Sequence, residues 1–481
     1  MLLITYQKSV MLRLTQWLTI TLLVPCSLVH AEDLLDIYHQ AQTADSVYQA
    51  AKFSLEATSE KIPQARAGLL PAIGITANDN GTHAKSTFTG NPQVTRDIQT
   101  WAWTAQLTQP LIRLQSIYAY HESKAQVEQA MAQYTLAEQN LILRVAQAYF
   151  DVIVAQEGVL VAEAQQVAMK AQLAQAEHGF KAGTVSVTDV YEAKSHAGSA
   201  HAQWVAANND LEKKKAELEK IVGQPTAKLA ILKLGASMAR PTPDVQQEWM
   251  DQAKQNNPAV KAQEAALKVS EAEVKRNRAE YAPTLDLVAS YGANSSSGTL
   301  VNPNDFATLT RSSQLGVQIT IPIFTGGSTT SKVREAIANQ SKSDADLETA
   351  RRQAATDARV AFVGIEGGLS QIEALTSAVE SGKAAVKGNQ VGYKVGIRIN
   401  IDVLNTEQQL FAAQRDLAKA RYDTLLEGLK LKAAAGILAE QDLIEINQLF
   451  GDASLAGNDY MIYGENAFNA GDSEIASADH L

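Results

Sequence analysis

Alternating apolar and polar residues predict β-strands in four stretches of the chain. In the first stretch, Ile73 and Ile75 alternate with Gly74 and Thr76, which places the apolar side chains on one face only. The four predicted strands lie at residues 69–80, 98–110, 283–293 and 313–323, with polar loops at 81–97 and 294–312. Each run is about ten residues, the length of a tilted strand that crosses a membrane. A soluble sheet with one wet face would show the same alternation.

A heptad pattern of apolar residues predicts helices of unusual length. No proline stands between Pro110 and Pro225, and seam residues recur at alternating spacings of four and three. These residues are Val127, Met131, Tyr134, Leu141, Val145, Ala148, Val152, Ala155 and Val159, with Glu138 in the one gap. A helix over residues 115–178 would span roughly 95 Å at about 1.5 Å per residue. Further helices are predicted at residues 33–67, 185–222, 249–280, 328–390 and 399–435.

The whole pattern occurs twice, at an offset of 212 to 213 residues. Residues 179–183 read GFKAG and residues 392–396 read GYKVG, and further matches before and after them are colinear. We therefore expect two copies of one unit, each made of a helix, two strands, a long helix, a tip turn and a return helix. The units are residues 32–224 and 245–450, with tip turns near 183 and 396 and a proline-bearing linker at 225–244.

The two ends of the chain differ from the repeats. Residues 1–31 have two positive charges, a short apolar run and the ending Val29-His30-Ala31, which predict a cleaved signal peptide. An N-terminal membrane anchor is the alternative, although the apolar run is short for a spanning helix. After residue 31, no run of about 18 apolar residues predicts a transmembrane helix. Residues 451–481 carry six acids and no Lys or Arg, which predicts a disordered tail.

Composition excludes several classes of function. The 42 basic and 52 acidic residues give a net charge of −10, which argues against a nucleic-acid partner. Cys26 is the single cysteine and the eight histidines form no ligand pair, so we expect no metal and no cofactor. Gly326-Gly327 lacks the Lys-Ser/Thr of a phosphate loop, and no nucleophile motif is present. The sequence therefore predicts a protein that is not an enzyme.

Four membrane strands cannot form a closed barrel, because the smallest barrels have about eight strands. An open sheet edge in lipid would leave backbone N–H and C=O groups without partners. The chain must therefore oligomerise if its strands lie in a membrane. The long helices would then project from the end of the barrel that is opposite the polar loops.

These features together resemble the TolC family of outer-membrane efflux proteins. The resemblance covers roughly residues 32–450 and is most specific in the motif from Tyr393 to Leu404, followed by Ala420-Arg421-Tyr422 and residues 440–443. It implies an α+β membrane protein of two tandem repeats, each with two transmembrane β-strands and long coiled-coil α-helices. It also implies a homotrimer whose 12-stranded β-barrel, surrounded by outer-membrane lipid, continues as a periplasmic α-helical barrel.

Membership of this family implies export of drugs, small molecules or proteins. The chain would be the exit duct of a tripartite efflux pump or of a type I secretion system. Its partners would be a periplasmic adaptor protein and an inner-membrane pump of the RND, ABC or MFS type. Two alternatives remain open at this point: a structural or adhesive trimeric coiled-coil surface protein, and a periplasmic adaptor.

The resemblance also implies roles for residues at the two tip turns. The adaptor would contact Ala182, Gly183, Thr184, Val395, Gly396 and Ile397. Polar links among Tyr393, Arg398, Thr188 and Asp189 would hold the tunnel mouth closed. Asp402 would form the acidic ring at the narrowest point, and Asn405 stands where the family often has a second acid. The alternatives are turn glycines and solvated surface residues.

Overall fold

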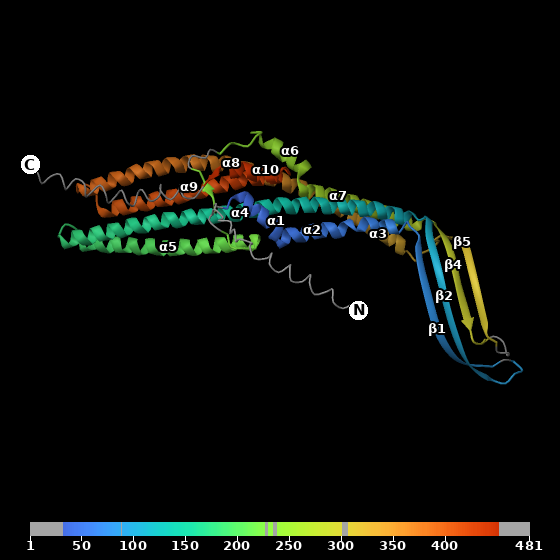
Figure 1. Ribbon diagram of the computed structural model, residues 1–481. Coiled ribbons are helices and arrows are strands. Elements are labelled where there is room, and N and C mark those ends of the chain that lie inside the picture. Colours follow the sequence, from blue (N-terminus) through green and yellow to red (C-terminus); the bar gives the residue numbers. More distant parts are fainter. Residues whose placement is uncertain (1–31, 88, 227–228, 234–237, 301–305, 452–481) are drawn as a thin grey trace, which may run out of the picture.

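The computed structural model describes residues 32–87, 89–226, 229–233, 238–300 and 306–451. The predicted signal peptide and all but the first residue of the predicted tail lie outside these residues. Most of the described chain is helical, and one sheet lies at one end of the long helices (Figure 1). The structure therefore has a helical part and a strand part that are distinct in space.

Four long helices form two antiparallel hairpins. The first hairpin consists of α4 (Leu114–Lys181) and α5 (Val187–Val222), and the second of α8 (Ser328–Lys394) and α9 (Asn400–Ala434). The hairpins lie side by side, and α4 contacts α9 along their shared length (Figure 1). Both tip turns lie at the end of the molecule opposite the sheet.

The apolar character of α4 reflects burial between helices. By length and composition α4 could cross a membrane, since one 18-residue window has a mean hydropathy of 1.3. Half of that window is buried inside the protein, as expected for a core helix. Leu141, Val145 and Tyr149 of α4 are fully buried, and they pack with residues from α1 and α9 in the largest apolar cluster.

Each helix expected before a strand pair is broken into shorter pieces. Residues 33–67 form α1 (Leu34–Ala44), α2 (Ser46–Ser59) and α3 (Lys61–Ala67). Residues 246–281 form α6 (Gln246–Asn256), α7 (Pro258–Arg278) and the 3-10 helix η1 (Ala279–Tyr281). The breaks have local causes, because Asp45 caps α2 and Pro258, at the first position of α7, has no N–H for a continuous helix.

The sheet contains four antiparallel strands in the order β1-β2-β4-β5. Their bounds are Ala72–Ser86 for β1, Val94–Ile112 for β2, Thr284–Ser296 for β4 and Thr308–Thr320 for β5. The first hairpin is longer than expected, because residues predicted as a polar loop pair with each other, from Gly81↔Gln99 to Ser86↔Val94. Backbone pairing needs no apolar side chain, so the alternation marked only the apolar part of these strands.

The two faces of the sheet have opposite polarity. One row across the four strands consists of Ile73, Leu107, Ala289 and Leu315, which are paired neighbours. The next row consists of Gly74, Gln106, Ser290 and Gln314 and lies on the opposite face. Trp101, Trp103 and Tyr291 extend the apolar face toward the outer loops, and the rings of Trp103 and Tyr291 meet edge to face at 5.7 Å.

The segment expected as a linker contributes to the core. Its strand β3 (Ile231–Leu232) pairs with β6 (Phe450–Gly451), which follows α10 (Glu440–Asn447). Phe450 stacks on Phe150 of α4, with ring centroids 6.0 Å apart. The segment between the repeats thus contains a strand that was not predicted, and α10 and β6 were not predicted either. A two-residue strand shows no periodicity, so its pairing depends on partners about 220 residues away.

Candidate functional site

The α4–α5 tip turn closes with two backbone hydrogen bonds. The Thr184 N–H donates to the Gly179 carbonyl at 2.9 Å, and the Gly183 N–H donates to the Phe180 carbonyl at 3.0 Å. Gly183 has a φ of 74°, the left-handed conformation that glycine adopts without strain. This is the Schellman arrangement that satisfies the last carbonyls of a helix.

The α8–α9 tip turn repeats this geometry at an offset of 213 residues. The Ile397 N–H donates to the Gly392 carbonyl at 2.8 Å, and the Gly396 N–H donates to the Tyr393 carbonyl at 3.0 Å. Gly396 has a φ of 76°. A Cβ atom on Gly392 would lie 2.8 Å from Cγ of Arg398, so this glycine lets the Arg398 side chain lie against the end of α8.

The predicted contact residues lie on the surface at the tips. Ala182, Gly183, Thr184, Val395, Gly396 and Ile397 are all exposed. Val395 and Ile397 have 62% and 80% of their surface exposed, although both are apolar. The second tip thus presents an accessible apolar surface, and the first tip presents an accessible turn of small residues.

Asp189 belongs to a capping box at the start of α5. Its carboxylate accepts the Ser186 N–H at 3.1 Å, and the Ser186 hydroxyl accepts the Asp189 N–H at 3.2 Å. Thr188 is exposed beside it. Asp189 therefore stabilises the first turn of α5 within its own hairpin.

Tyr393 lies in the last turn of α8, beside the second tip turn. Its side chain is half-buried, and this burial, followed by the negative charge of Asp189, raises the pKa of the Tyr393 phenol. The fold places both tip turns at the same end of the molecule within one chain (Figure 1).

Arg398, which stands just before α9, forms an ion pair with Asp402 in the first turn of that helix. Its Nη1 lies 3.6 Å from Oδ2 of Asp402, and the two side chains are 57% and 36% exposed. The sequence placed Arg398 in the gate and Asp402 in the ring, without a link between them. Asn405 is exposed one turn further along α9. An exposed pair of this kind contributes about 0–1 kcal/mol, so a new partner could replace it.

Sequence reasoning missed two polar residues beside these. The Asn389 amide donates to the Thr406 hydroxyl at 2.8 Å and joins α8 to α9 behind Asp402. Glu407 is 5% exposed and accepts a hydrogen bond from Gln390 at 2.9 Å. A signal was present, because Asn400, Glu407 and Gln414 are polar residues at heptad spacing on a helix of apolar seam residues.

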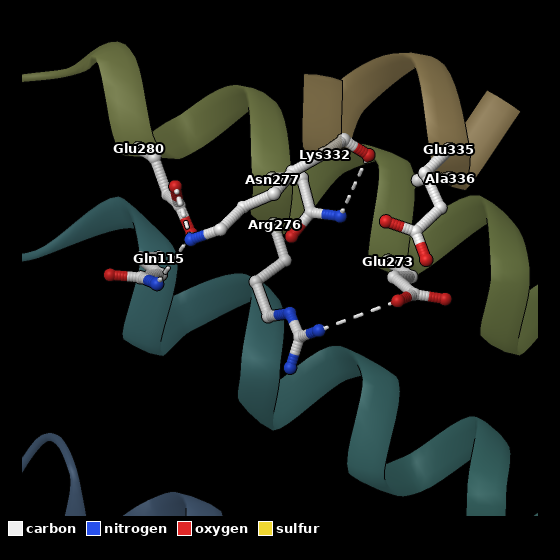
Figure 2. Close-up of a pocket in the computed structure, with 8 residues that line it drawn as sticks. All are labelled: Gln115, Glu273, Arg276, Asn277, Glu280, Lys332, Glu335 and Ala336. Carbon is white, nitrogen blue, oxygen red and sulfur yellow. Dashed lines mark hydrogen bonds and ion pairs between the residues drawn. The ribbon is translucent and has the colours of Figure 1, made fainter. Parts of the chain in front are cut away.

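A polar cavity of about 310 Å³ lies at the other end of the helices, where α4, α7 and α8 meet. Figure 2 shows its lining: Gln115, Glu273, Arg276, Asn277, Glu280, Lys332, Glu335 and Ala336. The charges are largely paired, with Lys332 3.0 Å from Glu280 and Arg276 3.2 Å from Glu122. The described residues include no cluster of His, Cys, Asp or Glu that could hold a metal ion. These contacts hold the helices together above the sheet.

Comparisons with known proteins place the chain among outer-membrane channels. A family model described as "Outer membrane efflux protein" matches residues 37–224 and 249–437. The chain is 31% identical over 427 residues to the outer membrane protein TolC of Vibrio cholerae, covering 88% of this chain and 94% of that protein. It is 30% identical over 415 residues to the alkaline protease secretion protein AprF of Pseudomonas aeruginosa, covering 85% of each.

A solved structure supports the fold independently. The CmeC outer membrane channel of Campylobacter jejuni superposes with a TM-score of 0.72 at 18% identity, covering 88% of this chain and 90% of that chain. The two matches to the family model fall on the two repeats found in the sequence.

Proposed function

The chain belongs to the outer membrane efflux protein family, and on that premise we propose that three copies form one exit duct for a tripartite efflux pump or a type I secretion system. The resemblance seen in the sequence is confirmed. The protein is an outer-membrane protein with its helical part in the periplasm, and its relatives are channel and transport proteins rather than enzymes.

The observation that carries the proposal is the sheet with one apolar and one polar face, joined to helices of up to 68 residues. An apolar outer face with aromatic residues suits lipid, and a polar inner face suits a water-filled lumen. Helices of this length, about 100 Å, reach far into the periplasm. An adhesive coiled coil would need no such sheet.

The two free edges of the sheet call for neighbouring copies, and the resemblance to the family implies that there are three of them. β1 and β5 are the outer strands of the order β1-β2-β4-β5, and all neighbouring strands are antiparallel. β1 of one copy can therefore pair antiparallel with β5 of the next. Three copies give a closed barrel of 12 strands, which leaves no edge in lipid.

The tips are the proposed contact surface for a periplasmic adaptor, which would link the duct to an inner-membrane pump of the RND, ABC or MFS type. Val395 and Ile397 supply exposed apolar side chains there, beside Gly396. The equivalent turn at Ala182, Gly183 and Thr184 supplies the second half of the surface. Exposed apolar groups at the end of a hairpin are the kind of patch that binds a protein.

The proposed gate at the periplasmic end of the tunnel consists of residues beside the two tip turns. Asp402 would face the axis as one of three carboxylates, with Asn405 beside it and Arg398 within 3.6 Å of it. In the assembled duct, Arg398 would exchange Asp402 for Thr188 or Asp189 of a neighbouring hairpin. Tyr393 would supply a second link, since the negative charge of Asp189 already contributes to the raised pKa of its phenol.

Planar-bilayer recordings test this assignment. Asp402→Ala should reduce cation selectivity and divalent block, because it removes the ring of carboxylates. Asn405→Asp should strengthen the block by adding a second ring. The matched control is Asp416→Asn, which removes an exposed acid further along α9 and should change neither property. Unchanged selectivity in Asp402→Ala would exclude Asp402 from the constriction.

The proposed links of Arg398 and Tyr393 across the gate are tested by the double variant Arg398→Ser with Tyr393→Phe. It should raise single-channel conductance without lowering the amount of trimer, since each lost link contributes about 1–3 kcal/mol and three copies act together. A correctly assembled double variant with unchanged conductance would assign these residues to the solvated surface.

A further inference from the structure

Helix α9 carries a seam of buried polar residues at heptad spacing. Asn400, Glu407 and Gln414 are 3%, 5% and 8% exposed. Each has a buried polar atom without a hydrogen-bond partner in the described part of the chain, namely Nδ2 of Asn400, Oε2 of Glu407 and Oε1 of Gln414. Unpartnered buried polar atoms weaken packing, so this seam is less stable than an apolar one.

Glu407 is the ionisable member of the seam and joins three helices. Its Oε1 accepts hydrogen bonds from Gln390 of α8 at 2.9 Å and from Gln172 of α4 at 3.5 Å. Leu404, one turn earlier on α9, packs with Met169 of α4 in an apolar cluster. The carboxyl group therefore lies where the α8–α9 hairpin meets α4 of the other hairpin, with neutral amides as its hydrogen-bond partners.

Ionisable groups on the surrounding helices do not compensate a charge on Glu407. Within two helical turns of its contacts these groups are Lys170, Glu177 and His178 on α4; Tyr191, Glu192, Lys194, His196 and His201 on α5; Lys383, Lys387, Tyr393 and Lys394 on α8; and Asp402 on α9. Among the described residues, the groups that set the pKa of Glu407 are not these charges. Burial raises the pKa, and the hydrogen bonds from the amides of Gln390 and Gln172 lower it. An ionised Glu407 would therefore be a buried charge stabilised mainly by two amides.

Burial raises the pKa of Glu407 from its ordinary value of 4.5, and the hydrogen bonds from Gln390 and Gln172 only partly oppose this effect. The packed arrangement therefore prefers the neutral acid. This packing is most stable below the ordinary pKa and loses stability as pH rises through the raised pKa. Each unit of difference in pKa between the packed and loosened arrangements changes their ratio about tenfold.

We propose that Glu407 is a proton-linked contact between the two helical hairpins, which holds α9 against α4 when neutral and loosens this packing when ionised. The contact itself follows from the single chain. Only its consequence, that the periplasmic mouth opens more readily as pH rises, rests on the proposed duct. Loss of protons from three copies would act on the same mouth.

A spin-label distance measurement tests the contact without requiring transport. The full-length protein carries Cys26→Ser and new cysteines at Ala174 of α4 and Gln408 of α9, which are both exposed. Distances are compared at about pH 4.5, where a carboxyl group with a raised pKa is mostly neutral, and at about pH 8. We expect a longer or broader distribution at the higher pH. An identical distribution at both values would overturn the proposal.

Two variants separate Glu407 from other titrating groups, including the histidines nearby. Glu407→Gln preserves the shape and hydrogen-bonding capacity of the side chain without a charge, so its distribution should match the low-pH form at both pH values. Asp416→Asn removes an exposed acid on the same helix and should keep the full pH response. If Glu407→Gln responds to pH as the parent does, another group is the cause and the assignment is wrong.

Conductance in planar bilayers then separates this contact from the proposed function. The parent should conduct more at about pH 8 than at about pH 4.5, and Glu407→Gln should lose that ratio. A spectroscopic response with a flat conductance ratio would support the contact and contradict its proposed effect on the mouth. A conductance ratio that persists in Glu407→Gln would overturn the inference while leaving the duct intact.

Discussion

Gly396 shows how one residue permits a long helix to reverse. Its φ of 76° is strained for any residue with a Cβ atom. The space around it is open, because no neighbouring atom lies within 4 Å of the position that a Cβ atom would take. The effect of a substitution is therefore conformational and involves no steric clash with neighbours.

Gly396→Ala should destabilise the second tip turn by about 1–2 kcal/mol, because alanine disfavours the left-handed conformation. The measurement is hydrogen exchange of the Ile397 and Arg398 amides, which both donate to the Gly392 carbonyl. Gly367→Ala is the matched control, since Gly367 is helical with open space around it, and alanine there should be neutral or slightly stabilising. Equal protection of these amides in Gly396→Ala and the parent would contradict the account.

Asp45 combines two roles in one buried side chain. It caps α2 by accepting the Tyr48 N–H at 2.7 Å, and it accepts two hydrogen bonds from Arg144 of α4 at 2.9 Å each. Burial raises the pKa of its carboxyl, but the hydrogen bonds from Arg144 and the Tyr48 N–H outweigh this and lower the pKa overall. The contribution to stability is thus present above the ordinary pKa and is lost as pH falls through the lowered value.

Replacement of Asp45 should separate the two roles. Asp45→Asn keeps a good capping residue but loses the charge-assisted bonds, which should lower the free energy of unfolding by about 1.5–3 kcal/mol. Asp45→Ala also loses the cap, which adds about 1 kcal/mol. Thermal unfolding in detergent at neutral pH measures both. The role of the cap is refuted if the two variants are equally stable.

At the scale of elements, the strands are defined by their two faces and the long helices by their seams. Leu315 and Val317 of β5 are 75% and 59% exposed in the single chain, although both are apolar. In α4, by contrast, the apolar seam residues Leu141, Val145 and Val152 are buried against neighbouring helices. The apolar face of the sheet is therefore the surface that we propose faces lipid.

Val317→Arg should impair insertion into outer membranes, because a charge on the lipid face costs about 2–4 kcal/mol near the bilayer centre. Gln318→Arg, one residue further along β5 and on the opposite face, should insert nearly as well as the parent. The fraction of folded protein in outer-membrane vesicles measures the difference. Equal insertion of both variants would mean that this sheet does not face lipid as proposed.

At the scale of the whole molecule, the free edges of the sheet are the feature that calls for neighbouring copies. β1 and β5 have no strand beyond them among the described residues. A membrane sheet with two open edges is unstable in lipid. In the proposed duct, these two edges pair with the edges of neighbouring copies.

Cysteines on the two edges should capture the trimer. With Cys26→Ser, a pair at Thr76 of β1 and Gln314 or Gln318 of β5 should form a disulfide between neighbouring copies, because both edges would meet in a closed barrel. Non-reducing electrophoresis should then show a covalent species of three copies. A second cysteine pair within β1 and β2, at Thr76 and Thr104, serves as the control and should stay within one copy. Detergent-extracted protein that remains monomeric after crosslinking, with its β-structure intact, would refute the assembly.

The sequence by itself determined the features that depend on neighbours along the chain. Alternation predicted where four strands lie and heptads predicted the long helices, because side-chain burial follows the period of each element. The glycines at 183 and 396 marked the reversals, and the repeat showed that the same unit occurs twice. Resemblance to a known family then supplied the function, which periodicity alone could not.

Only the tertiary structure decided the contacts between distant residues. It paired β3 with β6, and it brought Arg398 within 3.6 Å of Asp402. It also buried Glu407 between Gln172 and Gln390, which lie on two other helices. The heptad spacing could mark Glu407 as a seam residue, but it could not show which helices lie against it, because those contacts join residues far apart in the chain.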